Sequence, residues 1–143
     1  MKNIFLDTDI VIDFLIDREP FSDYAAQILS LGEVSKLRIY ISALTFSNTY
    51  YVLRKFATHR KVIDKLKKLE TITRIVEVNG KSINLALQSS FRDFEDALQY
   101  CSALQQQNID VIITRNVKDY RDSVLPVMTA ETCLKLINSE AGA

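Results

Sequence analysis

The chain has 143 residues, of which 48% are hydrophobic and 25% charged, and 18 basic residues balance 18 acidic ones. This length and composition are typical of one globular domain and exclude a disordered chain. The zero net charge excludes a chain-wide field that favours nucleic acid, so any such signal must be local.

The sequence also argues against a membrane-spanning, a secreted or a disulfide-bonded protein. No apolar run approaches the roughly 18–20 residues of a membrane span. The N-terminal segment turns acidic at Asp7, too early for the apolar region of a signal peptide. Cys101 and Cys133 lie in helix-like apolar patterns without a CxxC partner, which is typical of reduced core residues. We therefore expect a cytoplasmic protein without membrane contact.

Short apolar runs alternate with segments of helical periodicity along the chain. In chain order we expect a strand at 4–6, a helix at 21–34, a strand at 39–41, helices at 44–56 and 61–69, a strand at 73–78, helices at 82–90 and 94–107, strands at 111–113 and 127–128, and a last helix from the N-cap Thr129 to Ile137. Wholly apolar strands between helices predict a parallel sheet covered on both faces. We find no linker, and so expect one α/β domain over residues 1–138 and a short tail at 139–143.

Acidic residues gather where the predicted strands end. In open α/β sheets the functional crevice lies beyond the carboxyl ends of the strands. The candidates for that crevice follow the first strand, begin the helix at 94–107, or follow the fourth strand: Asp7, Asp9, Asp93, Asp96, Thr114, Asn116 and Asp119. Asp93 and Asp96 are three residues apart and share one helix face.

Clustered carboxylates repel one another and raise each other's pKa, unless a cation neutralises them. Ligands that are all oxygen suit Mg²⁺ or Mn²⁺ better than zinc. Such an ion lowers the pKa of a bound water and stabilises charge on a phosphate. The pattern therefore indicates metal-dependent phosphoryl chemistry. The alternative is that these acids cap helices, Asp7 or Asp9 for the next helix and Asp93 with Asp96 for its own.

Four stretches carry a family resemblance: residues 5–15 (FLDTDIVIDFL), 41–48 (ISALTFSN), 93–99 (DFEDALQ) and 113–120 (ITRNVKDY). In this order and at these separations, they resemble the PIN-domain family of ribonucleases, which includes the toxins of VapBC toxin–antitoxin pairs. The resemblance covers about residues 4 to 136.

The resemblance implies an α/β/α sandwich with a short parallel sheet, whose acids bind one or two Mg²⁺ or Mn²⁺ ions. A metal-activated water then cleaves an RNA phosphodiester and leaves a 5′-phosphate. Carried over by position, the metal ligands are Asp7, Asp96 and Asp119 or Asn116, with Asp93 as a further acid, Thr114 as the hydroxyl that holds the site together, and Asp9 where the family often has Asn or Ser. The resemblance also implies a homodimer and a small antitoxin protein that covers the crevice.

One position departs from the family pattern. Asn48 stands where the family usually has Glu. An asparagine carbonyl can coordinate Mg²⁺ or hold a water, but the lost charge should weaken metal affinity. Three interpretations stay open: an enzyme that works with Asn48 and the remaining acids, one that needs more metal, or an inactive domain that binds RNA or protein.

Charge is unevenly distributed along the chain. Between Arg54 and Arg74 there are eight basic residues against two acidic ones. Because the phosphate backbone supplies most non-specific affinity for nucleic acid, candidate RNA contacts are Lys61, Lys65, Lys68 and, beside the acids, Arg115. The alternative is a solvated helix face.

A second enzyme class shares the opening motif. An apolar strand followed by Asp7-x-Asp9 fits the nucleophile loop of haloacid-dehalogenase-type phosphatases, in which an aspartyl-phosphate would form on Asp7. That loop normally continues with Gly-Thr or Gly-Val, whereas Ile10 follows here. We therefore favour the ribonuclease over the phosphatase.

Overall fold

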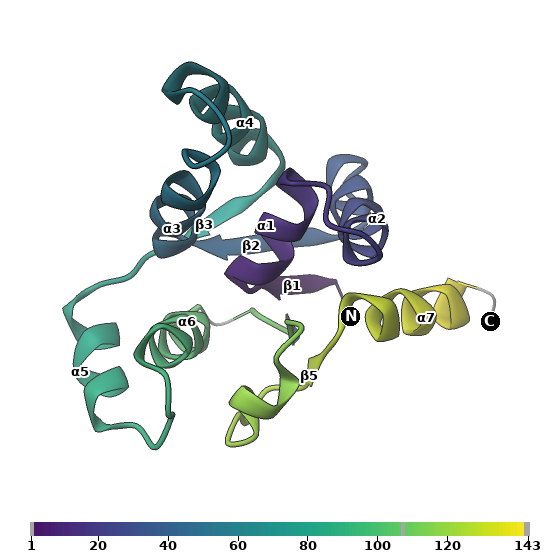
Figure 1. Ribbon diagram of the computed structural model, residues 1–143. Helices are drawn as coiled ribbons and strands as arrows, with labels where there is room; N and C mark the ends of the chain where they lie inside the picture. Colours follow the sequence, from purple (N-terminus) through teal and green to yellow (C-terminus); the bar gives the residue numbers. More distant parts are fainter. Residues whose placement is uncertain (1, 107, 142–143) are drawn as a thin grey trace.

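The computed structural model describes residues 2–106 and 108–141 (Figure 1). Within these residues one sheet contains five strands, all paired in parallel, in the order β3-β2-β1-β4-β5. The strands are β1 (Asn3–Leu6), β2 (Arg38–Ser42), β3 (Arg74–Val76), β4 (Val111–Ile113) and β5 (Val127–Met128). The parallel sheet that the apolar runs predict is confirmed.

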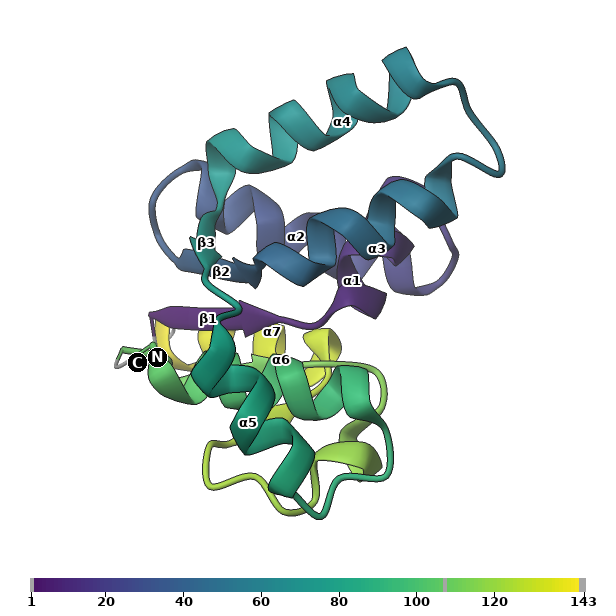
Figure 2. The same cartoon turned by 90° about the vertical axis from the view of Figure 1, so that its left-hand side faces the viewer.

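Helices connect the strands and cover both faces of the sheet. They are α1 (Thr8–Leu15), α2 (Phe21–Glu33), α3 (Ala43–Leu53), α4 (His59–Ile72), α5 (Gly80–Gln88), α6 (Phe94–Gln105), the 3₁₀ helix η1 (Val117–Tyr120) and α7 (Ala130–Ala141). Helices α2 and α7 lie on one side of the sheet and α5 and α6 on the other (Figure 1). Helix α4 is outermost, beyond α2 and α3 (Figure 2).

Alternating strand residues are buried in two separate hydrophobic cores, because successive side chains of a strand point to opposite faces of the sheet. Ile4 and Leu6 of β1 are fully buried with α1, α2 and α7, whereas Phe5 is fully buried with α5 and α6. Both faces of the sheet are therefore covered at β1, and polar chemistry is left to the strand ends. Cys101 and Cys133 are buried free thiols, one in each core, as predicted.

Polar side chains cap the N-termini of five helices. Asp7, Ser42, Thr58, Asn79 and Asp93 each accept a hydrogen bond from a backbone N–H of the first turn. Such N-caps satisfy donors that the helix itself leaves free. Two of these caps are acids at the carboxyl edge of the sheet, where the sequence predicts the functional crevice.

The element boundaries differ from the predictions at several points. Helix α1 was not predicted, because its β-branched run Ile10 to Ile12 resembles a strand. Strand β3 is shorter than the predicted 73–78, and α6 ends at Gln105 rather than at 107, which lies outside the described residues. Helix α7 includes residues 139–141 of the expected tail, and 142–143 also lie outside the described residues. Across the described ranges, no helix has the length and apolarity needed to cross a membrane.

Candidate active site

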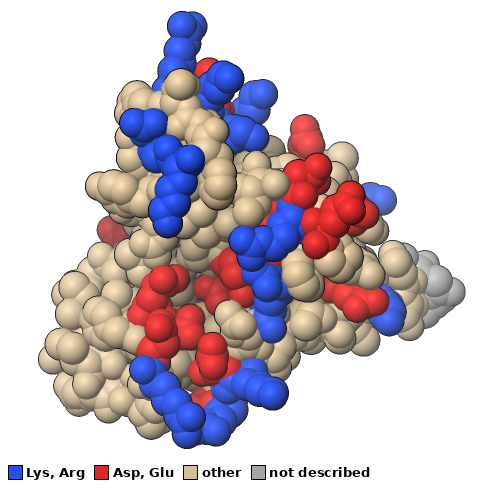
Figure 3. Space-filling model, viewed as in Figure 1, with Lys and Arg blue, Asp and Glu red and all other residues tan. Residues whose placement is uncertain are grey.

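An acidic cavity of about 320 Å³ lies at the carboxyl ends of β1 and β4. Its lining residues come from α1, the start of α6 and the segment after β4: Asp7, Thr8, Asp9, Ile12, Asp93, Glu95, Asp96, Asn116 and Asp119. Figure 3 shows acidic side chains gathered in this hollow, below the position of α1 in Figure 1. The structure thus brings together every acid that the sequence proposed for the site.

Asp7 is the most deeply placed of these acids, with 3% of its surface exposed. One carboxylate oxygen, Oδ1, accepts the Thr8 N–H at 2.8 Å, and Oδ2 accepts the hydroxyls of Thr114 at 2.9 Å and Tyr120 at 3.1 Å. Burial raises the pKa of Asp7, and these three hydrogen bonds lower it in part. Thr114 contacts Asp7 from outside the cavity lining.

Asp9 has one oxygen engaged and one free. Its Oδ2 accepts the backbone N–H of Arg115 at 3.1 Å and the side-chain amide of Asn116 at 3.4 Å. Its Oδ1 is buried and finds no hydrogen-bond partner among the described residues. Burial and the charge of Asp7 raise the pKa of Asp9 to about 7. A buried, unpartnered carboxylate oxygen is a donor atom that a cation could use.

The start of α6 supplies three more acids. Asp93 caps the helix, since its Oδ1 accepts the backbone N–H of Asp96 at 3.0 Å, so the capping alternative is confirmed for this residue. Asp96 is partly buried, and burial together with the charges of Asp7 and Asp93 raises its pKa to about 7. Glu95, to which sequence reasoning gave no role, also lines the cavity.

Asp119 and Asn116 come from the segment after β4. Both are exposed and line the cavity from the side of η1. The same segment contributes Tyr120, which is 1% exposed and donates its hydroxyl to Asp7. Sequence reasoning gave Tyr120 no role, although it ends the fourth motif.

A buried polar network supports the cavity floor. The Thr8 and Thr45 hydroxyls are 2.9 Å apart, and Gln99 Nε2 donates to both, at 2.8 and 3.1 Å. All three residues are buried, and they join α1, α3 and α6. A glutamine within the apolar stretch of α6 is the sequence signal that could have found this network.

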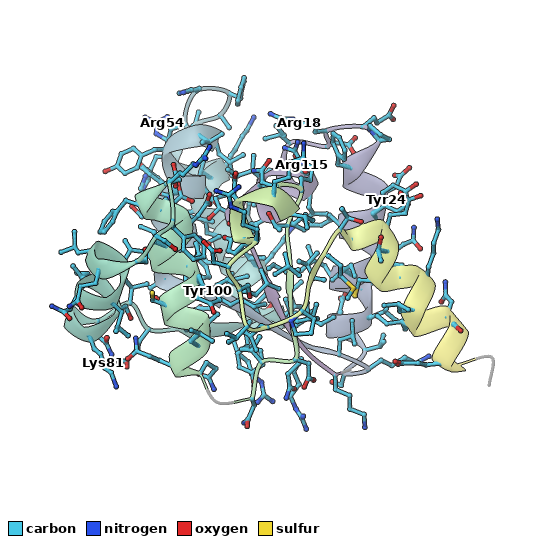
Figure 4. All side chains as sticks on the ribbon, turned by 90° about the horizontal axis from the view of Figure 1, so that it is seen from below. Arg18, Tyr24, Arg54, Lys81, Tyr100 and Arg115 are labelled. Carbon is cyan, nitrogen blue, oxygen red and sulfur yellow. The ribbon has the colours of Figure 1, made fainter. Side chains whose placement is uncertain are left out.

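The predicted RNA contact Arg115 is occupied elsewhere. Its Nε donates to Asp13 Oδ2 at 2.6 Å and its Nη2 to Oδ1 at 3.1 Å, while the guanidinium lies 4.4 Å from the Phe21 ring centre. Asp13 is fully buried, and Arg18 approaches it at 3.7 Å. Figure 4 shows Arg115 and Arg18 close together. The Arg115 side chain therefore anchors the segment after β4 and does not line the acidic cavity.

The predicted contacts on α4 are also separate from the cavity. Lys61, Lys65 and Lys68 are exposed, and the basic group over α4 stands apart from the acidic hollow (Figure 3). A second hollow of about 230 Å³ adjoins the acidic cavity, because Asp93 and Asp119 line both. Its basic lining residues are Arg92, Lys118 and Arg121. Their positions next to the motif acids are the signal that sequence reasoning missed.

The donor set fits a hard divalent cation. The cavity lining offers carboxylate, amide and hydroxyl oxygens, without His, Cys, Lys or Arg among the described residues. Within residues 2–106 and 108–141, no group of three or more acidic, His or Cys side chains is already arranged to hold an ion. The carboxylates therefore have to turn toward a cation. Burial first, and the charges of neighbouring acids second, raise the pKa values of Asp9 and Asp96, and a bound cation would oppose both effects.

The fold and the cavity define a parallel α/β/α sandwich with an acidic site at the carboxyl edge of its sheet. The sequence matches the PIN domain family over residues 3–118, and the chain belongs to this family. A comparison with curated protein sequences gives no match.

Solved structures share this fold at low sequence identity. A DNA-bound VapBC from Salmonella typhimurium is 16% identical with a TM-score of 0.69, and the alignment covers 91% of this chain and 99% of that one. A toxin–antitoxin complex from Klebsiella pneumoniae is 22% identical, with a TM-score of 0.65 and coverage of 89% and 97%. VapC20 of Mycobacterium tuberculosis, described as a Sarcin-Ricin loop cleaving toxin, is 18% identical, with a TM-score of 0.60 and coverage of 76% and 86%.

Proposed function

We propose that the protein is a Mg²⁺- or Mn²⁺-dependent endoribonuclease, the toxin of a toxin–antitoxin pair. The observation that supports this most is the acidic cavity at the ends of β1 and β4 in a chain of the PIN family. Asp7, Asp96 and Asp119 would hold the metal, with Asp93, Asn116 and Asn48 in support. When bound, the ion supplies an activated water and positive charge against the phosphate.

The surrounding side chains prepare this site. Thr114 and Tyr120 fix the Asp7 carboxylate, since both donate to its Oδ2. Burial raises the pKa of Tyr120, which therefore stays a neutral donor. Asp96, with a pKa of about 7, is partly protonated at neutral pH and would have to be ionised to hold a cation, so metal affinity should rise with pH.

We place the RNA backbone over the second hollow. Arg92, Lys118 and Arg121 lie next to acids of the cavity, so a phosphate held there adjoins the scissile one. The exposed Lys61, Lys65 and Lys68 of α4 form the competing surface. Removing one basic side chain that binds a phosphate should reduce the salt dependence of single-strand binding by about 0.7 in the log–log slope. Two triple-alanine variants, one for each surface, compared at several salt concentrations, separate these two paths.

We propose two protein partners, of which the relatives support the first. The Salmonella VapBC and the Klebsiella toxin–antitoxin complex are structures of toxins with antitoxins. We propose a small antitoxin for this chain too, and a homodimer of the chain itself. Light scattering after size exclusion, with and without the product of an adjacent small reading frame, tests both.

The decisive experiment is cleavage of a tRNA and ribosomal RNA mixture with Mn²⁺, Mg²⁺ or EDTA. We expect discrete fragments that require metal and disappear in Asp96→Asn. Asp64→Asn is the matched control, because Asp64 is exposed on α4 and outside the cavity. No cleavage at high Mn²⁺ would favour the alternative of an inactive domain that binds RNA or protein. Release of phosphate from small esters would favour the phosphatase, against which the family match argues.

A further inference from the structure

Glu95 is an acid of the cavity to which neither the four motifs nor the capping pattern assigns a role. Its carboxylate lies partly buried in the cavity lining, near enough to the side chains of Thr8 and Asn48 for both to lower its pKa. It also lies near enough to Asp7 and Asp93 for their charges to act on it. A solvated first-turn acid would have no such neighbours.

Helix geometry explains why Glu95 points into the site. Glu95 and Gln99 are four residues apart in α6 and therefore share one helix face. Gln99 on that face donates to Thr45 of α3 at 3.1 Å. On α3, Thr45 and Asn48 are three residues apart and share the facing side. The spacing therefore sets Glu95 opposite Asn48, one helix turn away from Gln99 and Thr45.

The charge balance makes this placement costly for the protein alone. Six acids line the cavity, and none of the lining residues among those described is basic. A side chain moved there from solvent loses hydration and meets like charge, unless something positive is bound. Asn48 offers only an amide N–H, which orients the carboxylate but does not neutralise it.

We infer that Glu95 is a further ligand of the divalent cation, and that the side-chain amide of Asn48 orients its carboxylate. The inference rests on the proposed metal site, and it concerns which element supplies the carboxylate on this side of the cavity. Helix α6 then contributes two metal-binding acids, Glu95 and Asp96, while α3 contributes the amide.

The competing explanation is electrostatic support of α6. An acid in the first turn of a helix interacts favourably with the helix dipole. In that case Glu95→Gln would lower the melting temperature slightly and leave metal affinity unchanged. The two explanations therefore differ in a binding measurement that needs no RNA.

The test is calorimetric titration of the full chain with Mn²⁺ alone. We expect Glu95→Gln to weaken Mn²⁺ binding about tenfold or more. The exchange variant, Asn48→Glu with Glu95→Gln, restores one carboxylate facing one amide and should recover affinity to within about threefold. Glu77→Gln is the matched control, because Glu77 is exposed after β3 and outside the cavity. Circular dichroism confirms folding, and Glu95→Asp, which keeps the charge, replaces Glu95→Gln if that variant unfolds.

The outcomes separate this inference from the nuclease proposal. Unchanged Mn²⁺ affinity in Glu95→Gln, or no binding by the wild type, overturns the inference. Weaker binding in Glu95→Gln without recovery in the exchange variant overturns the pairing with Asn48. Glu95-dependent Mn²⁺ binding in a protein that cuts no RNA refutes the nuclease and leaves the inference standing. Metal-dependent cleavage together with normal Mn²⁺ binding in Glu95→Gln overturns the inference and supports the nuclease proposal.

Discussion

Replacing Arg115 with Met should strongly destabilise the fold, because it leaves the carboxylate of Asp13 buried without its main partner. Asp13 is fully buried, and both of its oxygens accept hydrogen bonds from the Arg115 guanidinium, at 2.6 and 3.1 Å. Methionine keeps much of the side-chain length over Phe21 but removes every donor. The variant therefore isolates the charge from the packing.

The size of the effect follows from these interactions. Removing one partner of a buried ion pair costs about 3–5 kcal/mol, because the remaining charge is left uncompensated. Loss of the cation over the Phe21 ring adds about 0.5–1 kcal/mol. Arg18, which is half exposed and 3.7 Å from Asp13, can offset at most about 1 kcal/mol of this loss in stability. We expect a net loss of about 3–5 kcal/mol in the free energy of unfolding.

Urea unfolding of four proteins measures this loss: the wild type, Arg115→Met, Asp13→Asn and the double variant. In the Asp13→Asn background Arg115→Met should cost much less, since no charge is left behind. Arg18→Met is the control and should cost less than about 1 kcal/mol. A cost below about 1 kcal/mol for Arg115→Met, or the same cost in both backgrounds, would refute the reasoning.

Three further predictions concern the site and the core. Because the pKa values of Asp9 and Asp96 are raised from 3.8 to about 7, the folded protein binds more protons than the unfolded chain between about pH 4 and 7. Its metal-free melting temperature should therefore fall as pH rises through this window, and a rise would contradict the assignment. Thr114→Val removes one of the three hydrogen bonds to the carboxylate of Asp7 and leaves the backbone N–H of Asn116 without its partner, so it should cost about 1–3 kcal/mol in urea unfolding; a neutral result would mean that water replaces the hydroxyl. Gly32→Ala would set a Cβ 2.5 Å from a core isoleucine of β2 and should lower the melting temperature, whereas Gly80→Ala, with open space around it, should not; equal effects would contradict the packing.

Much of the fold could be predicted because each of its strands contains a short apolar run. Such runs, separated by amphipathic helices, leave few alternatives to a parallel sheet. The acids at 7 and 119 could be placed together for the same reason, since carboxyl ends of neighbouring parallel strands share an edge. Periodicity failed for α1, whose residues Ile10 to Ile12 look like a strand until Asp7 is recognised as the cap of a helix.

The finer features of the site depended on contacts that a sequence does not contain. Arg115 looked free for a phosphate, but its partner Asp13 lies 102 residues away in the chain. Glu95 was overlooked because the i,i+3 spacing and the family pattern singled out only Asp93 and Asp96 in this stretch. A cavity wide enough to be lined by both, and the face that Glu95 shares with Gln99, became visible only in three dimensions.

The order of the strands has a consequence for protein synthesis. The pairing of β1 with β4 joins residues more than 100 positions apart, and η1 adds the last acid of the cavity at Asp119. A nascent chain therefore cannot assemble the acidic site until most of its length has left the ribosome. If the protein cuts RNA, the translating ribosome is protected from its own product by the topology of the sheet, before any antitoxin is needed.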